Sequence, residues 1–329
     1  MKNIKTIATL ALATFLITGC STKKYFEPED TTDVEVSTSS LIADIKTINR
    51  DGATLDNGSF ISELGESQFQ LKEDFYFLNT TSNSDAISTN LKDKIYIGEK
   101  EYDLKNVAIA ATKKDNLIAI INSDNSLELR DTNNNILFRE YETLSLANDT
   151  RTTNPFFLGN LVLYPTLDGK IVIVSLETKK VIKKISVDPR GQFNNIIYLD
   201  VMEDGETLVA ASANNIVAIS PRNVVTREYE IRDVALDGNF IYAATLDGRV
   251  IKFSKNLEEQ ATQKFKFAKI NALASSKSAI YAAESQGYII KISKDFSNVA
   301  VDDLSYDESE KIIAIKNKFF TGDKVIVLP

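Results

Sequence analysis

The chain reads Asn239-Phe-Ile-Tyr-Ala-Ala-Thr-Leu-Asp-Gly-Arg-Val-Ile-Lys-Phe-Ser254 at the point that decides its fold. An apolar segment leads into Asp247-Gly248, and a segment of alternating polar and apolar residues follows. Asp-Gly between two such segments is a strong β-hairpin signal, because the tight turn requires a positive φ that glycine adopts freely. The stretch is therefore predicted to form two paired strands, with Asp247 and Gly248 as turn formers.

The same hairpin recurs along the chain. The clear copies are 160–175, 239–254 and 278–293, and the weaker or truncated copies are 116–130, 206–220 and 310–328. Successive turns lie 33 to 46 residues apart, which is the period of one four-stranded propeller blade. In the clearest unit the four strands are expected at 231–236, 240–245, 249–254 and 263–267. The repeats predict an all-β fold, a β-propeller over residues 41–329.

The number of blades follows from the repeats with one choice left open. Six copies lie between residues 107 and 329, and likely strand segments at 75–78 and 94–98 add one more. The last copy lacks a fourth strand, which a segment near 41–48 is expected to supply, so that no edge stays open. Seven blades are favoured, with eight as the alternative. Tyr242, Tyr281 and Tyr164 are expected to pack between neighbouring blades.

The N-terminus carries an export signal. Lys2 and Lys5 precede an uncharged apolar run over 7–17, which is shorter than the roughly 20 residues that span a bilayer. The run ends in Ile17-Thr18-Gly19-Cys20, which resembles the lipobox of bacterial lipoproteins. The resemblance implies that residues 1–19 are a signal peptide and that Cys20 receives an N-acyl group and an S-diacylglycerol group.

The predicted anchor is followed by a polar segment. Residues 20–40 are rich in Ser, Thr, Lys, Glu and Asp, so they are expected to form a flexible tether. The residue after the cysteine is Ser21 and not an Asp. By analogy with lipoprotein sorting in Gram-negative bacteria, this favours the periplasmic face of the outer membrane. Cys20 is the only cysteine of 329 residues, which argues against a disulfide role for it.

The composition excludes several kinds of site. The chain has no histidine and no second cysteine, which excludes a Ser-His-Asp triad, a Cys-His pair and a histidine-based metal site. No glycine-rich nucleotide-binding motif is present. Without residues 1–19, 36 basic residues face 46 acidic ones, so the net charge is −10, which argues against nucleic acid as a partner. No catalytic, cofactor-binding or metal-binding residues are predicted, and no cofactor.

The Leu-Asp-Gly-[Lys/Arg]-[Ile/Val] hairpins, together with Cys20, resemble those of β-propeller lipoproteins with quinoprotein-like or WD40-like repeats, of the BamB kind. The resemblance implies a non-catalytic scaffold that binds envelope proteins, among them the outer-membrane β-barrel assembly machine. The chain has no tryptophan, which argues against pyrroloquinoline quinone binding.

The alternative is a lipid-anchored hydrolase or small-ligand binder that uses the central channel. That alternative expects carboxylates to converge at the channel mouth, whereas a scaffold expects an exposed apolar patch among the loops. The candidate carboxylates are Glu63, Glu66, Asp74, Glu203 and Asp204.

Overall fold

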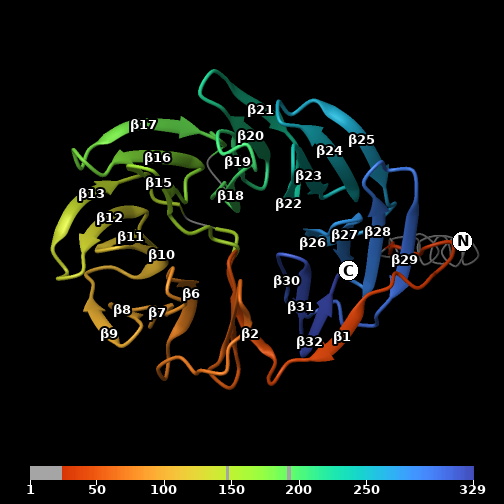
Figure 1. Cartoon of the computed structure of the whole chain (residues 1–329), viewed down its shortest axis with the longest axis horizontal. Coiled ribbons are helices and arrows are strands. Elements are labelled where there is room, and N and C mark those ends of the chain that lie inside the picture. Colours follow the sequence, from red (N-terminus) through yellow and green to blue (C-terminus); the bar gives the residue numbers. More distant parts are fainter. Residues whose placement is uncertain (1–23, 146–147, 191–193) are drawn as a thin grey trace, which may run out of the picture.

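A computed structural model describes residues 24–145, 148–190 and 194–329. Within these residues, 32 strands form eight antiparallel four-stranded sheets. The sheets are arranged as blades around a common centre (Figure 1). The β-propeller of four-stranded blades is therefore confirmed, but the favoured count of seven is wrong and the alternative of eight holds for the part described.

Each blade consists of four strands that are consecutive in sequence, apart from the last blade, which borrows its outer strand from the N-terminal region. Blades 1 to 4 contain β2 (Ile45–Ile48), β3 (Ala53–Leu55), β4 (Phe60–Ser62) and β5 (Gly65–Glu66); β6 (Tyr76–Thr80), β7 (Ala86–Thr89), β8 (Lys94–Ile97) and β9 (Lys100–Asp103); β10 (Ala108–Lys114), β11 (Leu117–Asn122), β12 (Ser126–Asp131) and β13 (Ile136–Tyr141); and β14 (Phe156–Leu158), β15 (Leu161–Pro165), β16 (Lys170–Ser175) and β17 (Val181–Ser186). Blades 5 to 8 contain β18 (Tyr198–Val201), β19 (Leu208–Ala211), β20 (Asn215–Ile219) and β21 (Val224–Glu228); β22 (Ile231–Asp237), β23 (Phe240–Thr245), β24 (Arg249–Ser254) and β25 (Glu259–Lys264); β26 (Ile270–Ser275), β27 (Ala279–Glu284), β28 (Tyr288–Ser293) and β29 (Val299–Asp303); and β30 (Ile312–Ile315), β31 (Lys318–Thr321), β32 (Lys324–Val327) and β1 (Ser37–Ser40).

The blade count was wrong because the first blade is built from unusually short strands. Residues 45–103 contain two blades where one was expected. Strands β3, β4 and β5 have three, three and two residues, which is too short to show an alternating pattern. In the sixth blade three strands lie close to the expected positions, and the outer strand β25 begins four residues earlier than expected.

The Asp-Gly hairpins form as predicted. Gly248 has a φ of +80°, and a Cβ there would lie 2.3 Å from the carbonyl oxygen of Phe265. The Thr245 hydroxyl donates to Asp247 at 2.6 Å and accepts from the backbone N–H of Arg249 at 3.1 Å. Gly169 has a φ of +78°. Glycine is required at Gly248 for two reasons, because the turn needs a positive φ and the neighbouring loop leaves no room for a side chain.

The tyrosines of the repeat pack between blades, as expected. Tyr242 lies in a core with Ile280 and Phe296 of the following blade, and Tyr281 packs against the last blade in the same way. Tyr164 lies one residue later in its own copy and packs against Phe138 of the preceding blade instead. A shift of one residue moves a side chain to the other face of its sheet, which explains the opposite direction.

A flexible tether was expected over residues 20–40, but from residue 24 onward this segment packs against the propeller. Residues 24–36, here called the strap, cross blade 7, and the chain then enters blade 8 as β1 (Figure 1). Phe26 is 7% exposed and Val34 is fully buried. The backbone N–H of Thr32 donates to the carbonyl oxygen of Val301 at 2.7 Å. The propeller therefore begins at Ser37 and not at residue 41.

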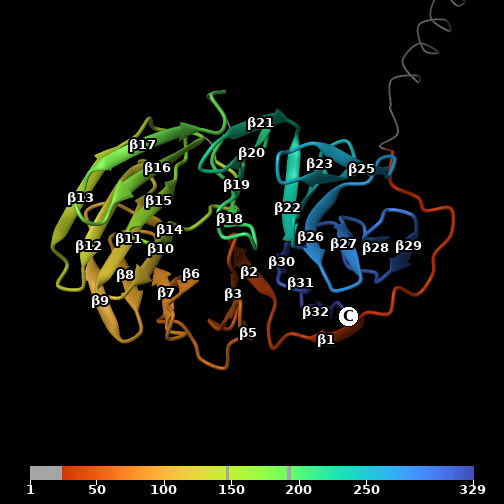
Figure 2. The ribbon, with the colours of Figure 1, turned by 45° about the horizontal axis from the view of Figure 1, so that its top comes forward.

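The ring closes with a strand from the N-terminal region, as expected, but a different segment supplies it. Strand β1 pairs antiparallel with β32, from Ser37 opposite Val327 to Ser40 opposite Lys324. The segment expected in this role contributes β2, the innermost strand of blade 1. A second view shows β1 alongside β32 and β2 on the inner side of its blade (Figure 2). In the described part of the chain, no helix is long and apolar enough to cross a membrane.

Candidate functional site

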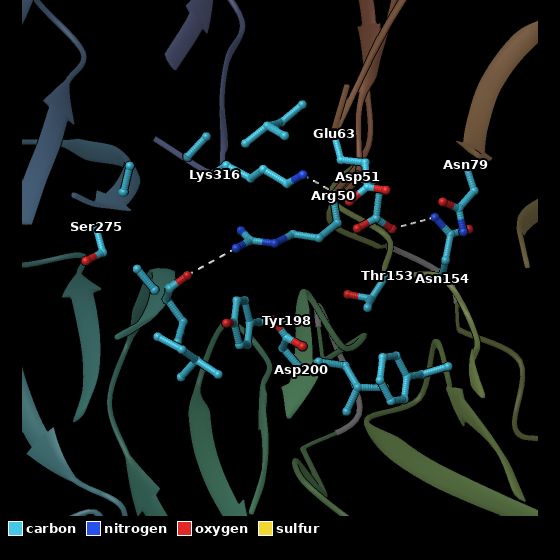
Figure 3. A pocket seen from close by; sticks show the side chains of 18 of the residues that line it. Arg50, Asp51, Glu63, Asn79, Thr153, Asn154, Tyr198, Asp200, Ser275 and Lys316 are labelled. Atoms are coloured by element: carbon cyan, nitrogen blue, oxygen red, sulfur yellow. Dashed lines mark hydrogen bonds and ion pairs between the residues drawn. The ribbon is translucent and has the colours of Figure 1, made fainter. Parts of the chain in front are cut away.

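A central cavity of about 1180 Å³, called the channel below, lies within the ring. Its wall takes residues from the innermost strand, or from the loop after it, of each of the eight described blades. The lining is mixed, with charged and amide side chains beside short apolar ones. Figure 3 shows the charged groups of this channel and the way in which Arg50 extends across it.

Arg50 lies in the turn between β2 and β3 and connects blade 1 to blade 6. Its guanidinium forms an ion pair with Asp233 and donates to the carbonyl oxygen of Val234 at 3.1 Å. It also lies 4.6 Å from the centre of the Tyr198 ring of blade 5, within cation–π range. Burial lowers the pKa of the Arg50 guanidinium, but Asp233, Tyr198 and Asp51 together outweigh burial and raise this pKa.

The turn that carries Arg50 is fixed from within blade 1. The backbone N–H of Asn49 donates to the carbonyl oxygen of Gly52 at 3.0 Å. A Cβ at Gly52 would lie 2.2 Å from both the Ile61 carbonyl oxygen and the Phe77 ring. Only glycine therefore lets this turn sit so close to β4 and blade 2. The tight packing sets the direction in which Arg50 leaves the turn.

Asp51 makes a second connection from the same turn. It accepts a hydrogen bond at 2.5 Å from the side-chain amide of Asn154, which precedes β14 of blade 4. Asn154 also donates to the Leu78 carbonyl oxygen at 2.9 Å and accepts from the Ala111 N–H at 2.8 Å. One amide thus joins blades 1, 2, 3 and 4.

The loop before β14 makes a third connection. Arg151 pairs with Asp149 at 2.6 Å and donates to the backbone carbonyl of Arg232 in blade 6. The Asp149 N–H donates to the side chain of Asn195, which lies just before blade 5, at 2.8 Å. Burial first, and then the charge of Arg151, lower the pKa of Arg232. Blades that are far apart around the ring are thus tied together across its centre.

Two carboxylates in the channel are held in an unfavourable setting. Burial raises the pKa of Asp51, and the charge of Asp200 raises it further. The hydrogen bond from Asn154 and the charge of Arg50 lower this pKa, but the net shift is upward. Burial also raises the pKa of Asp200. Both line the channel, where the hydrolase alternative expects carboxylates. Among the described residues, no group of acidic, histidine or cysteine side chains is placed to hold a metal ion.

The carboxylates considered from the sequence are scattered. Glu63 and Glu203 line the channel, and Glu63 pairs with Lys316 at 3.5 Å. Glu66 accepts from the Ile42 N–H at 2.8 Å, and Asp204 accepts from two backbone N–H groups of its own turn. Asp74 has a φ of +61° and does not line the channel.

The sequence patterns did not identify three charged residues of the channel, namely Arg50, Asp51 and Asp200. The Asp51-Gly52 dipeptide is the same turn signal that identified the other hairpins, so it could have shown both this turn and the extra blade. The sequence gives no sign that Arg50 reaches Asp233, because 183 residues separate them. The only residue to which the sequence assigns a chemical role, Cys20, lies with residues 1–19 outside the described part of the chain.

An exposed apolar patch lies at the outer edge of blade 1. It consists of Ile42, Leu64 and Phe69, which are 61%, 63% and 80% exposed. They surround β5, the two-residue outer strand, and the Ile42 N–H bonds to Glu66 of that strand. Exposed large apolar side chains near a sheet edge are common at protein-binding surfaces. This is the feature expected of a scaffold.

The chain is similar in sequence to two plasminogen-binding proteins named PgbB. The protein of Helicobacter pylori strain J99 is 26% identical over 316 residues, covering 80% of this chain and 58% of that protein. The protein of strain 26695 is 26% identical over 302 residues, covering 76% and 55%. The chain therefore spans just over half the length of these curated relatives. No family model matches the chain.

Solved structures share the fold. BamB of Moraxella catarrhalis superposes with a TM-score of 0.69 at 15% identity, covering 89% of this chain and 98% of that one. Sqt1 of Saccharomyces cerevisiae gives 0.60 at 9% identity, covering 89% and 97%. The designed protein Ika8 gives 0.59 at 14% identity, covering 90% and 98%. The chain has a BamB-like propeller fold, and the resemblance expected from its hairpins is confirmed at the level of the fold.

Proposed function

We propose that this chain is a lipid-anchored, non-catalytic propeller that binds proteins at the cell envelope. The observation that carries the proposal is the apolar patch of Ile42, Leu64 and Phe69 beside the two-residue strand β5. Strand β5 is the outer edge of its sheet, where an added strand can pair, and nearby apolar side chains supply contact area. The BamB-like fold and the similarity to two plasminogen-binding proteins support binding as the function.

The proposal names two partners for testing. The resemblance to BamB supports the outer-membrane β-barrel assembly machine, with outer-membrane protein assembly as the process. The names of the two sequence relatives support plasminogen as the second. Both are proteins, and both can be tested at the same patch.

Site-specific cross-linking tests the patch. A photoreactive phenylalanine analogue at Phe69 should capture an envelope protein in living cells, to be identified by mass spectrometry. Ile182 on β17 is the control, because it is 56% exposed on the outer strand of a blade with full-length strands. Equal capture at Phe69 and Ile182, or none at either, would contradict the proposal. Binding of purified plasminogen to the wild type and to Phe69→Asp tests the second partner.

The anchor is proposed from the sequence. Cys20 carries the lipid, and residues 1–19 are removed on export to the periplasmic face of the outer membrane. The variant Cys20→Ser should accumulate as unprocessed or soluble protein, measured by fractionation and by the mass of the N-terminal peptide. Normal processing and membrane retention of Cys20→Ser would contradict the proposed lipid anchor.

The channel supports a second candidate function, the binding of a small ligand. The observation that favours it is the pair Asp51 and Asp200 facing a channel of about 1180 Å³ with raised pKa values. Carboxylates in such a setting suit a cationic ligand, which would relieve the cost of their charge. Spermidine should then bind the wild type in calorimetry and bind Asp200→Asn more weakly. Undetectable binding to the wild type would remove this candidate.

A further inference from the structure

The strap fixes where a lipid on Cys20 would be held. Phe26 is inserted between blades 6 and 7, with its ring 6.2 Å from Phe265 and 5.5 Å from Tyr288, both edge to face. Phe26 lies six positions after Cys20, which is at most about 20 Å of extended chain. The region around Phe26 therefore stays within that distance of the anchor, whereas a flexible tether of 20 residues would leave the propeller free to turn.

A surface suited to lipid lies beside this point. A hollow of about 490 Å³ is bordered by Leu246, Asp247, Lys264, Lys266, Phe267, Ala268 and Lys269. These residues, with Lys24 of the strap, are called the lysine–aromatic patch. Leu246 is 47% exposed and Phe267 is 41% exposed.

The loops that form the patch are held together on one face of blade 6. The backbone N–H of Phe265 donates to the carbonyl oxygen of Gly248 at 2.8 Å. This bond joins the β23–β24 turn to the loop that leads from β25 to blade 7. The turn between β24 and β25, which contains Lys255, lies at the other end of the same strands, so it belongs to the opposite face.

The charges of the patch surround its apolar side chains. The Nζ atoms of Lys24 and Lys266 lie 5.3 and 5.1 Å from the centre of the Phe267 ring. Lys264 pairs with Asp247 at 3.1 Å and Lys269 with Glu308 at 2.7 Å. An exposed aromatic side chain flanked by lysines suits the interface of a membrane, where the apolar group enters and the ammonium groups meet lipid phosphates.

We propose that the lysine–aromatic patch lies against the lipid surface that holds Cys20, which fixes the orientation of the propeller. The proposal rests on the lipidation of Cys20 proposed above. The net charge of −10 gives no general attraction to anionic lipid. A local contact is still favoured, because charges more than about 8 Å away are largely screened at physiological salt. The anchor supplies the affinity, and the patch selects the face.

Depth-dependent fluorescence quenching tests the orientation. The full chain, expressed and processed in cells, is labelled at Lys266→Cys or at Lys255→Cys and reconstituted into vesicles of phosphatidylethanolamine and phosphatidylglycerol that contain a headgroup quencher. Both lysines are exposed on blade 6, so the pair is matched in residue type and in blade. Quenching should be several-fold stronger for the label at 266. Equal quenching, or stronger quenching at 255, would overturn the proposal.

The same samples separate a failed orientation from a failed anchor. Mass spectrometry of the N-terminal peptide reports lipid on Cys20, and flotation reports retention on vesicles. A lipidated, floating protein with equal quenching at both positions rejects the orientation and leaves the anchor standing. A protein with an unmodified Cys20 that does not float rejects both.

Discussion

Two buried tyrosines differ in whether their hydroxyl group is hydrogen-bonded, so the contribution of that hydrogen bond to stability can be measured. Tyr164 donates to the carbonyl oxygen of Glu128 at 2.8 Å, whereas the hydroxyl of Tyr242 has no hydrogen-bond partner among the described residues. Burial, followed by the charge of Asp237, raises the pKa of Tyr242 to about 12. Both side chains are fully buried, so their apolar contributions match.

We expect Tyr164→Phe to lower the free energy of unfolding by about 1 kcal/mol. The substitution removes a buried hydrogen bond and leaves the Glu128 carbonyl oxygen without this donor. Tyr242→Phe should be neutral or slightly stabilising, because it removes an unpaired buried hydroxyl. Guanidinium unfolding of both variants beside the wild type measures the difference. An equal loss in the two variants would mean that the Tyr242 hydroxyl has a partner.

Asp51 should make the stability of the protein fall as the pH rises. Its folded-state pKa is raised by burial, so the folded protein holds the proton more tightly than the unfolded chain. The stabilisation is fully present below the unfolded pKa of about 3.9 and is lost as the pH rises through the raised folded value.

The variant Asp51→Asn removes this titration and keeps an oxygen that can accept from Asn154. The gain in Tm of Asp51→Asn over the wild type should therefore grow from pH 4 to pH 8. Scanning calorimetry at several pH values measures it. A difference in Tm that stays constant with pH would show that Asp51 does not titrate in that range.

At the scale of elements, the strap was the hardest segment to foresee. Phe26 and Val34 are isolated apolar side chains in a mostly polar segment, so local composition predicts a flexible chain. The segment is ordered because both side chains are buried against the propeller, Phe26 beside Phe265 and Tyr288. The long hairpins were predictable because alternation and Asp-Gly act within a few residues. Blade 1 was missed because its strands are shorter than one clear period, although Asp51-Gly52 marks its first turn.

Phe26→Ala should release the strap. The substitution removes two edge-to-face ring contacts and leaves a hollow between blades 6 and 7, a change that costs about 3–5 kcal/mol in a closed core and less at this edge. Hydrogen exchange at the Thr32 amide, bonded to Val301, should become faster. Tyr25→Ala is the control, because Tyr25 is 43% exposed. Unchanged exchange in Phe26→Ala would mean that the strap is held elsewhere.

Across the whole molecule, two kinds of contact hold the ring together. Neighbouring blades share apolar cores, and strand β1 closes the ring between the two ends of the chain. The contacts across the channel are polar, and two of them, from Arg50 to Asp233 and from Arg151 to the Arg232 carbonyl, join blades that are not neighbours. Such contacts limit how far the ring can flatten or shear, so their energy should appear in the unfolding of the whole propeller.

The pair of Arg50 and Asp233 offers the sharpest test of that idea. Their side chains are 17% and 4% exposed, and Asp233 also accepts from the Leu273 N–H of blade 7 at 2.7 Å. Arg50→Met leaves Asp233 buried without its cation, a loss of about 3–5 kcal/mol for a buried pair.

The control is Lys94→Met, which removes a lysine paired with Glu101 and Asp103 at the surface of blade 2. This substitution should shift the unfolding midpoint far less than Arg50→Met, because exposed ion pairs contribute little to stability. The loss in Arg50→Met should also speed hydrogen exchange in both blade 1 and blade 6, because the pair restrains the two together. Faster exchange in blade 1 alone would show that Arg50 stabilises its own turn and does not brace the ring.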